Sequence, residues 1–340
     1  MSNVIISDPT LRDGNHAVGH QLSVSQIKAY AKAANRARVS ILEVGHGNGL
    51  GASSLQVGIA KESDRSLLEA AKSEMTMTKL GIHCIPGFAT IERDLKLALS
   101  IGVDVFRIAS HVTEADVTKN HISFIREKGK EVYGVLMMSH MANIETLVSE
   151  ATKMESYGAE GIVIMDSAGA YLPKDVKERI QALRSSLKGH VGFHGHNNLG
   201  MAVANSLVAA ENGASILDGT ARGFGAGAGN TQLEVLVAVL EKSGFSTGVD
   251  LYKMLDAGNV AEEVLLETTP SVKSTSIASG LAGVFSGFIK HVDRIAQDYS
   301  VDSRDILFQL GKRGIVAGQE DIIIEVALEL TGKKHQDDKL

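Results

Sequence analysis

Two histidines two residues apart, His194 and His196, stand at the end of a short apolar run and are followed directly by Asn197 and Asn198. Successive side chains of a β-strand alternate between its faces, so both imidazoles are expected to point to the same side. Imidazole nitrogens at this spacing are suited to binding one divalent metal ion. A lone His-X-His pair has a second interpretation, because the same two side chains can hydrogen-bond to loop carbonyl groups.

A candidate third ligand stands near the N-terminus, in the segment SDPTLRDGNHAVGHQ. In a closed barrel, only one strand separates the strand that leads to Asp13 from the strand of the histidine pair. One carboxylate and two imidazoles leave open coordination positions and suit Mn²⁺, Co²⁺, Fe²⁺ or Zn²⁺, which polarise carbonyl groups as Lewis acids. In the same segment, Arg12 is a candidate for binding an oxyanion or carboxylate, and His16 for proton transfer. Considered alone, Arg12 would more often be a surface ion-pair residue and His16 a loop histidine.

Eight short runs rich in Val and Ile are expected to be the strands that position these residues. The runs begin at Asn3, Ile41, Lys79, Val103, Glu131, Gly161, His190 and Ala214. Apolar strands that alternate with helical segments indicate a parallel sheet that is buried on both faces. Eight such units predict an α/β protein with a closed (β/α)₈ TIM barrel, and an open doubly wound sheet is the alternative.

The segments between these runs carry the start and stop signals of helices. Ser23, followed three residues later by Gln26, forms a capping-box pattern before apolar residues at helical spacing. The same spacing recurs over residues 144–157, 174–187 and 200–212, and glycine follows two of these segments, at Gly158 and Gly213. Glycine is the preferred left-handed cap at the end of a helix.

Past the eighth run, the strand signal fades and helical patterns continue to the C-terminus. We therefore expect two domains. Residues 1–230 would form the catalytic barrel, and residues 231–340 a helical C-terminal extension that could bind a partner.

Polar residues collect at the ends of the predicted strands, where barrel enzymes carry their active sites. These residues are His46, His83, His111, His140, Asp166, His194, His196, Asp218 and Arg222. Six of the 12 histidines are among them, which random placement would not produce. Each of the first four, considered singly, is more often a core or capping residue.

A glycine-rich segment, GTARGFGAGAGNTQLE, follows the eighth run and begins at Gly219. We expect it to line the site, with Asn230 supporting a metal ligand or binding the metal through its carbonyl oxygen. A flexible linker is the alternative interpretation. The segment lacks the Lys-Ser/Thr ending of a nucleotide-binding P-loop.

The composition favours small-molecule chemistry. The 340 residues are 44% hydrophobic, and 34 Lys and Arg are scattered among 40 Asp and Glu, which argues against a nucleic-acid or anionic-membrane surface. A single cysteine, Cys84, excludes an internal disulfide framework. With no signal-peptide pattern and no apolar run of roughly 18 residues, we expect a cytoplasmic protein without membrane contact.

Several blocks together resemble a known family. TLRDG, HGHNNLG, MDSAGA and GFGAGAGNTQLE are similar to those of the 4-hydroxy-2-oxovalerate aldolases, which are class II pyruvate aldolases of the HMG-CoA lyase-like metal-dependent barrel family. The resemblance covers essentially the whole chain. It implies a carbon-carbon lyase that reversibly cleaves a 4-hydroxy-2-oxo acid, such as 4-hydroxy-2-oxopentanoate, to pyruvate and an aldehyde through a metal-stabilised pyruvate enolate, as in aromatic hydrocarbon catabolism.

The same resemblance implies roles for particular residues. The metal ligands would be Asp13, His194 and His196, and the metal is usually Mn²⁺, with Co²⁺, Mg²⁺ or Zn²⁺ as alternatives. Arg12 would stabilise the enolate oxygen, and His16 would be the base that takes the proton from the 4-hydroxyl group. The family match also implies the substrate-binding residues, which would be Arg12, Asp13, Ser167, His194 and Phe285.

The chain departs from the family at two places. Phe285, in AGVFSGF, stands where the family usually has a tyrosine, and Ala317, in VAGQED, stands where it tends to have a glycine. The first departure leaves open the aldehyde and the stereochemistry, and the second leaves open whether an acylating aldehyde dehydrogenase or another copy of the chain binds the C-terminal region. The alternative functions are a Claisen-type acyl-CoA lyase or synthase on the same barrel, and a non-catalytic subunit that binds an oxo acid.

Overall fold

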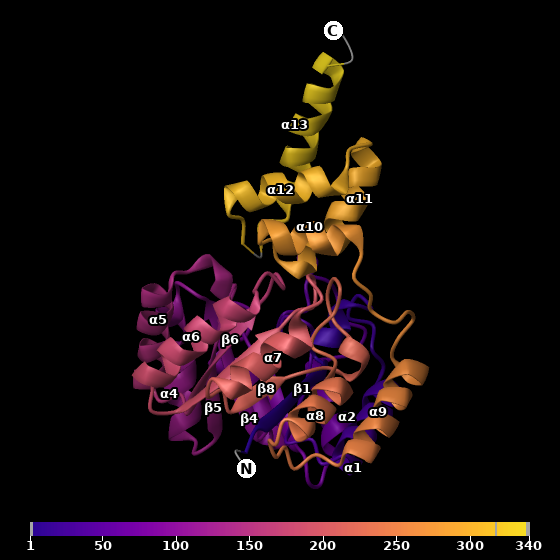
Figure 1. The fold of residues 1–340 in the computed structure, drawn as a ribbon. Helices are drawn as coiled ribbons and strands as arrows, with labels where there is room; N and C mark the ends of the chain where they lie inside the picture. The colour runs from indigo at the N-terminus through magenta and orange to yellow at the C-terminus, as the bar shows by residue number, and fades with distance from the viewer. Residues whose placement is uncertain (1–2, 317, 338–340) are drawn as a thin grey trace.

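The computed structural model describes residues 3–316 and 318–337, with side chains up to residue 332, and contains a closed barrel of eight parallel strands in the order β1 to β8 (Figure 1). The strands are β1 (Ile5–Leu11), β2 (Ile41–Val44), β3 (Lys79–Cys84), β4 (Val105–His111), β5 (Glu131–Met137), β6 (Gly161–Asp166), β7 (His190–Gly195) and β8 (Ile216–Asp218). Seven of them lie within predicted runs, and β1 overlaps the first run but continues beyond it to Leu11, so the TIM barrel is confirmed and the open sheet is excluded.

Helices follow the strands and cover the outside of the barrel (Figure 1). They are α1 (Val24–Arg36), α2 (Asp64–Lys72), α3 (Lys96–Ile101), α4 (Lys119–Glu127), α5 (Ile144–Ser156), α6 (Pro173–Ser186), α7 (Ala202–Glu211), α8 (Leu233–Lys242) and α9 (Leu251–Val264). A C-terminal group consists of α10 (Ser274–Ala282), α11 (Ile289–Tyr299), α12 (Ser303–Arg313) and α13 (Asp321–Asp337).

The predicted helix signals at both ends are confirmed. Ser23 and Gln26 form a complete capping box at the start of α1, where the Gln26 side chain accepts a hydrogen bond from the Ser23 backbone at 2.9 Å. Gly158 and Gly213 have φ values of 114° and 101°. Only glycine adopts such angles without strain, so these two residues allow the chain to leave α5 and α7 and enter the next strand.

Pairing between β1 and β8 closes the barrel and decides which residues can meet inside it. Ser7 on β1 lies opposite Asp218 on β8, and Gly192 on β7 lies opposite Ile216. The segment that follows β1 therefore lies two strands away from β7. This is the arrangement that the predicted metal site requires.

The chain has separate hydrophobic cores in the barrel and in the C-terminal group. Leu233 on α8 and Met254 on α9 are buried in the cluster that joins the barrel strands to their helices. A second cluster begins at Ala278 and contains only residues from the C-terminal group. The packing therefore changes after Leu265, later than the predicted division at residue 230, because α8 and α9 complete the outer helical layer of the barrel.

The C-terminal group stands on the end of the barrel where the strands finish (Figure 1). The His140 ring hydrogen-bonds to the Gly283 carbonyl at 2.9 Å, and the ammonium of Lys290 donates to the Ala17 carbonyl at 2.6 Å. His140 and Ala17 lie in the segments that follow β5 and β1. The extension is therefore attached directly to the loops that form the expected active-site end.

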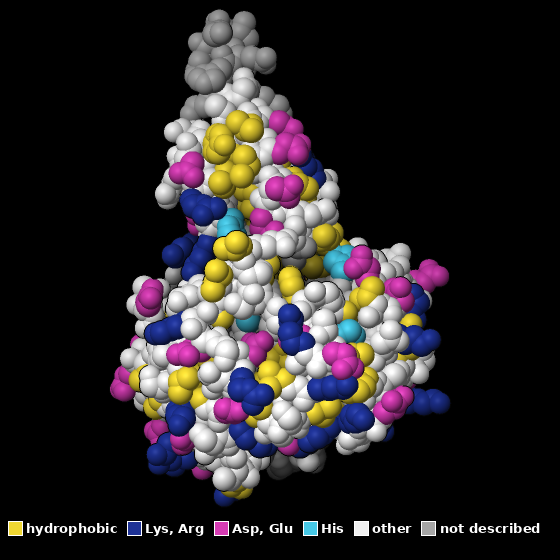
Figure 2. Space-filling view, turned by 180° about the vertical axis from the view of Figure 1, so that it is seen from behind, with side chains coloured by type: hydrophobic (Ala, Val, Ile, Leu, Met, Phe, Trp, Pro, Cys, Tyr) yellow, Lys and Arg dark blue, Asp and Glu magenta, His cyan; other side chains and the backbone are white. Residues whose placement is uncertain are grey.

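Figure 2 shows basic and acidic side chains interspersed over one face of the molecule, without a continuous basic area. This distribution agrees with the charge pattern of the sequence. Within the part of the chain that the structure describes, no helix combines the length and apolar character needed to cross a membrane.

A buried carboxyl group on β1 should make stability depend on pH. Asp8 accepts hydrogen bonds from the Thr10 backbone at 2.9 Å and the Tyr30 hydroxyl at 2.6 Å, and burial raises its pKa from 3.8 to about 7. Between these two pKa values the folded state holds a proton that the unfolded chain releases. The contribution of Asp8 to the free energy of unfolding is therefore complete below pH 3.8 and is lost as the pH rises through 7. The free energy of unfolding should change by about 4 kcal/mol in total, because each pKa unit corresponds to about 1.4 kcal/mol.

Asp8→Asn should remove this dependence. In urea unfolding of the metal-free protein, we expect the variant to gain stability relative to the wild type as the pH rises from 4 through 7, and this gain should level off above about pH 8. The difference between the two proteins cancels the other titrating groups. A difference that is constant over this range would contradict the raised pKa of Asp8.

Candidate active site

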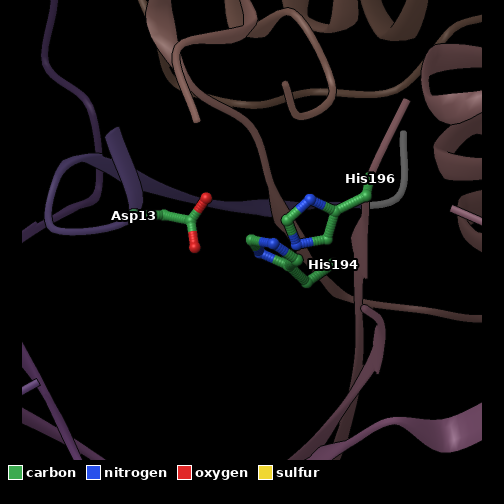
Figure 3. Close-up of side chains that lie close together, drawn as sticks. All are labelled: Asp13, His194 and His196. Atoms are coloured by element: carbon green, nitrogen blue, oxygen red, sulfur yellow. The ribbon is translucent and has the colours of Figure 1, made fainter. Parts of the chain in front are cut away.

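The three predicted metal ligands meet at the end of the barrel where the strands finish. Asp13 begins the short 3₁₀ helix η1 (Asp13–His16) after β1, His194 lies on β7, and His196 follows β7. All three are buried, and one ligand atom from each lies within 4.8 Å of the others. Figure 3 shows the carboxylate and the two imidazoles facing one another. The alternating His-X-His spacing predicted that the two imidazoles lie on one side, and the closed barrel brings Asp13 to them.

The hydrogen bonds around the three side chains leave nitrogen atoms free. His194 Nδ1 lies 2.9 Å from Asp218 Oδ2, while His194 Nε2 is buried without a partner. His196 Nδ1 is also buried without a partner. Because unpaired buried polar atoms are costly, two such nitrogens beside a carboxylate indicate a ligand-binding centre. The donor set fits a divalent metal ion, and the Asp218 contact is the usual support for a metal-binding imidazole.

The protonation states also suit a metal ion. Burial alone raises the pKa of Asp13, but the positive charge of Arg12, with smaller contributions from His196 and His16, outweighs this effect and holds the pKa well below its usual range. Burial lowers the pKa of His196 to about 3. At neutral pH the site therefore presents a carboxylate and a neutral imidazole, which are the forms that bind metals.

Arg12 lies against the carboxylate and keeps one donor free. Its Nη1 donates to Asp13 Oδ1 at 2.8 Å and to the Gly47 carbonyl at 3.2 Å, and its Nε donates to Glu43 Oε2 at 3.1 Å. Its Nη2 is buried without a partner. A rigidly held guanidinium with an unused N–H group is suited to binding an oxyanion.

His16 ends η1 and belongs to a group of three imidazoles. Its ring lies 5.0 Å from that of His20, which stacks on the His46 ring at 3.6 Å between centroids. Burial lowers the pKa of His16 below 6.5, despite the opposing effect of Asp13. A neutral imidazole beside the ligand cluster can accept a proton.

Asn230 supports the carboxylate from the glycine-rich segment. Its Nδ2 donates to Asp13 Oδ2 at 2.6 Å and to the Phe224 carbonyl at 3.3 Å, and its Oδ1 is buried without a partner. The segment therefore packs against the site, as predicted, and is not a flexible linker.

Ser167 and Phe285 come from different parts of the chain and meet through Ser286. The Ser167 carbonyl accepts hydrogen bonds from the Ser286 backbone at 3.1 Å and from its hydroxyl at 3.0 Å. The Phe285 ring packs edge-on against Phe288 at 5.6 Å. The other departure from the family pattern, Ala317, lies outside the described residues.

Other polar residues at strand ends have structural contacts instead. The His111 ring hydrogen-bonds to the Thr113 hydroxyl at 2.9 Å, and Asp166 accepts from the backbones of Ala170 and Tyr171 at 2.9 and 3.0 Å. Arg222 pairs with Glu234 and Glu262, away from the ligand cluster. Strand-end position alone therefore does not identify a site residue.

Comparison with known proteins decides the family. Residues 3–261 match the HMGL-like family, and residues 270–332 match a DmpG-like communication domain. The chain is 59% identical to the 4-hydroxy-2-oxovalerate aldolase of Spirochaeta aurantia, over 97% of each chain. It is 60% identical to that of Pectobacterium atrosepticum, over 96% of this chain and 95% of the relative. The chain belongs to the 4-hydroxy-2-oxovalerate aldolase family.

A solved structure shows the same fold at low identity. The carboxyl transferase domain of Rhizobium etli pyruvate carboxylase, solved with pyruvate and biocytin, superposes with a TM-score of 0.81 at 16% identity. The match covers 97% of this chain and 61% of that one. For the aldolase, this likeness supports the barrel fold alone.

Sequence reasoning missed two buried charges of the aldolase, Glu43 on β2 and Arg107 on β4. Both lie inside the barrel, with exposures of 0% and 1%. Each is a charged residue within an otherwise apolar strand, in ILEVGHG and VDVFRIASH. Because charges are rarely buried without a partner, that pattern could have identified them.

Gly47 leaves the space that the His16 ring of the aldolase occupies. A Cβ atom at this position would lie 2.6 Å from three ring atoms of His16. We expect Gly47→Ala to displace the imidazole and to lower kcat about 10- to 100-fold, as a misplacement of about 1 Å can do. Mn²⁺ affinity, measured by calorimetry, should stay within about twofold, because the alanine does not touch the ligands. Gly332→Ala, which has nothing within 4 Å, is the control; equal rates for all three proteins would show that His16 tolerates the displacement.

Proposed function

We propose that this chain reversibly cleaves a 4-hydroxy-2-oxo acid, such as 4-hydroxy-2-oxopentanoate, to pyruvate and an aldehyde at the site around Asp13, His194 and His196. One observation carries the proposal: Arg12 binds Asp13, which with two histidines fits a divalent metal ion, and Arg12 keeps a buried Nη2 without a partner. Fixed positive charge at this place matches the negative charge that develops when the carbon–carbon bond breaks.

The residues have separate tasks in the proposed cleavage. A divalent ion, for which Mn²⁺ is the first candidate and Co²⁺, Mg²⁺ and Zn²⁺ are alternatives, would supply Lewis-acid charge for the oxygens of the 2-oxo acid. His16 takes the proton from the 4-hydroxyl group while that carbon becomes the aldehyde. The electron pair of the broken bond moves into the pyruvate fragment as an enolate, whose oxygen Arg12 stabilises. Protonation of the enolate carbon then gives pyruvate.

Proton exchange into pyruvate tests this proposal directly. Metal-free protein in D₂O is mixed with pyruvate, and the methyl signal is followed by proton NMR before and after addition of a low concentration of Mn²⁺. We expect the methyl signal to disappear only when metal is present, because the enolate takes up deuterium. Bound Mn²⁺ without exchange, together with no pyruvate release from 4-hydroxy-2-oxopentanoate, would overturn the proposed chemistry.

The acyl-CoA lyase alternative finds no support at the site. A lyase of that type would carry a cysteine on the glycine-rich loop, whereas Cys84 is buried on β3. Burial also raises the pKa of the Cys84 thiol. This cysteine is therefore a core residue, neither exposed nor ionised.

Phe285 supports a proposal about the aldehyde. Its backbone leads directly into Ser286, which binds the Ser167 carbonyl, and it lacks the hydroxyl of the family's usual tyrosine. We infer that the chain discriminates less between the two stereoisomers at C4. Phe285→Tyr should increase the ratio of the two kcat/KM values, measured with each isomer of 4-hydroxy-2-oxopentanoate. A strict preference in the wild type would remove the basis for this inference.

The C-terminal group supports a proposal about the partner. It matches a communication domain and is hydrogen-bonded to loops at the active-site end of the barrel. We infer that it binds an acylating aldehyde dehydrogenase, which would consume the aldehyde. In size-exclusion chromatography, the two purified proteins should elute in a shared peak when they are mixed and in separate peaks when each is run alone. A dimer of this chain that does not take up the dehydrogenase would show that a second copy is the only partner.

A further inference from the structure

A chain of ion pairs runs behind the candidate site, through the inside of the barrel. At one end, His194 Nδ1 contacts Asp218 Oδ2 at 2.9 Å. At the other end, Arg12 donates to Asp13 at 2.8 Å and to Glu43 at 3.1 Å. These contacts hold the two sides of the site separately, and a further side chain must join them if they are to keep a common geometry.

Arg107 on β4 is that side chain. Its Nη2 donates to Asp218 Oδ2 at 2.7 Å, and its Nη1 donates to the Glu43 carboxylate and, at 3.0 Å, to the Ser7 hydroxyl. The same oxygen of Asp218 therefore receives both Arg107 and the ring of His194. Among the residues that the structure describes, Arg107 hydrogen-bonds to Ser7, Glu43 and Asp218 and not to Asp13, His194 or His196, so it acts on the site through Asp218 and Glu43.

The surroundings of Arg107 make the link rigid. The residue is 1% exposed, and Glu43 and Asp218 are equally enclosed. Its planar guanidinium binds the two carboxylates with different nitrogen atoms, which a lysine with a single nitrogen cannot reproduce. The side chains come from β2, β4 and β8, so the rigid frame of the barrel fixes their separation.

We propose that Arg107 is a positioning residue for the reaction, which fixes the His194 ring and the Arg12 guanidinium relative to each other through Asp218 and Glu43. This inference rests on the proposed function, because it assigns His194 to the metal and Arg12 to the enolate. Loss of Arg107 therefore weakens metal binding and enolate formation together, although Arg107 contacts neither the metal ion nor the substrate.

The test compares the wild type with Arg107→Lys, Asp218→Asn and the double variant. Mn²⁺ affinity is measured by calorimetry, the Mn²⁺ environment by electron paramagnetic resonance, and kcat and KM by methyl exchange in pyruvate. Both single variants should weaken Mn²⁺ binding about 10- to 100-fold, the usual effect of losing a group that orients a ligand. Arg107→Lys should also lower kcat and alter the resonance spectrum, which a purely structural role would leave unchanged.

The double variant tests whether Arg107 and Asp218 act through the same histidine. Its Mn²⁺ affinity should be close to that of the weaker single variant, because residues in one network do not have additive effects. Tyr133→Phe is the matched control: Tyr133 lies opposite Arg107 on β5, and its hydroxyl contacts Glu131 instead of the site. It should retain the wild-type affinity and kcat.

The outcomes separate this inference from the proposed function. A wild-type protein that binds no Mn²⁺ and exchanges no methyl protons would overturn the proposed function and, with it, the role of Arg107. If the wild type binds Mn²⁺ and exchanges methyl protons, and Arg107→Lys has the same Mn²⁺ affinity and kcat, the role of Arg107 alone would be overturned. Losses of Mn²⁺ affinity that multiply strictly in the double variant would also overturn it. If Arg107→Lys does not fold, Glu43→Gln decides: it should weaken Mn²⁺ binding about tenfold, and wild-type affinity would refute the link.

Discussion

Replacing His196 with alanine is expected to lower Mn²⁺ affinity at least about 100-fold and to abolish methyl exchange in pyruvate. The loss should exceed the 10- to 100-fold effect of removing a group that only orients a ligand, because the proposed ligand itself is removed. The imidazole is buried, neutral and incompletely hydrogen-bonded. Its removal should therefore affect metal binding much more than the fold.

Calorimetry and thermal unfolding measure the two effects separately. Mn²⁺ at 100 times the wild-type Kd should stabilise the wild type by about 2.7 kcal/mol and His196→Ala by at most about 0.4 kcal/mol. His190→Ala is the matched control, because His190 is exposed at the start of the same strand and hydrogen-bonds to Ser215 at 2.8 Å. Full Mn²⁺ occupancy and activity in His196→Ala would show that the ligand set is wrong.

Arg12→Lys is expected to lower kcat about 100- to 1,000-fold, the range found when an oxyanion donor is removed. Lysine keeps the positive charge but cannot bind Asp13, Glu43 and the Gly47 carbonyl in one plane and still offer a free donor, as the guanidinium does. Binding of pyruvate should weaken less than kcat falls, because the enolate carries more charge on its oxygen than the ketone does.

The measurement is methyl exchange at saturating Mn²⁺, with KM and kcat determined separately. Arg65→Lys is the control, because Arg65 forms an exposed ion pair with Glu69 on α2 and should leave both constants unchanged. If Arg12→Lys raised KM and left kcat unchanged, Arg12 would bind the ground state of the substrate and have no special role at the enolate.

Local patterns in the sequence were sufficient for the elements and for part of the site. The apolar runs predicted all eight strands, because a strand that is buried on both faces of a parallel sheet consists almost entirely of apolar residues. The capping box at Ser23 and the left-handed caps at Gly158 and Gly213 were also predictable, since each depends on a few neighbouring residues. His194 and His196 were predictable as a pair, because the period of a strand is two.

The remaining features depended on closure of the barrel. Asp13 could be assigned to the histidine pair only on the assumption that β8 pairs with β1, and the structure shows that pairing. The division of cores after Leu265 was not visible in the helical pattern, because helices on a barrel and helices in a separate group have the same apolar spacing.

The sequence by itself determined the strands, the helix ends and the residue types of a candidate metal site with an arginine beside it. Only the tertiary structure decided that Glu43, Arg107 and Asp218 form one chain of ion pairs between Arg12 and His194. The physical reason is distance along the chain: these contacts join strands that are far apart in sequence, and their partners are defined only when the sheet closes on itself.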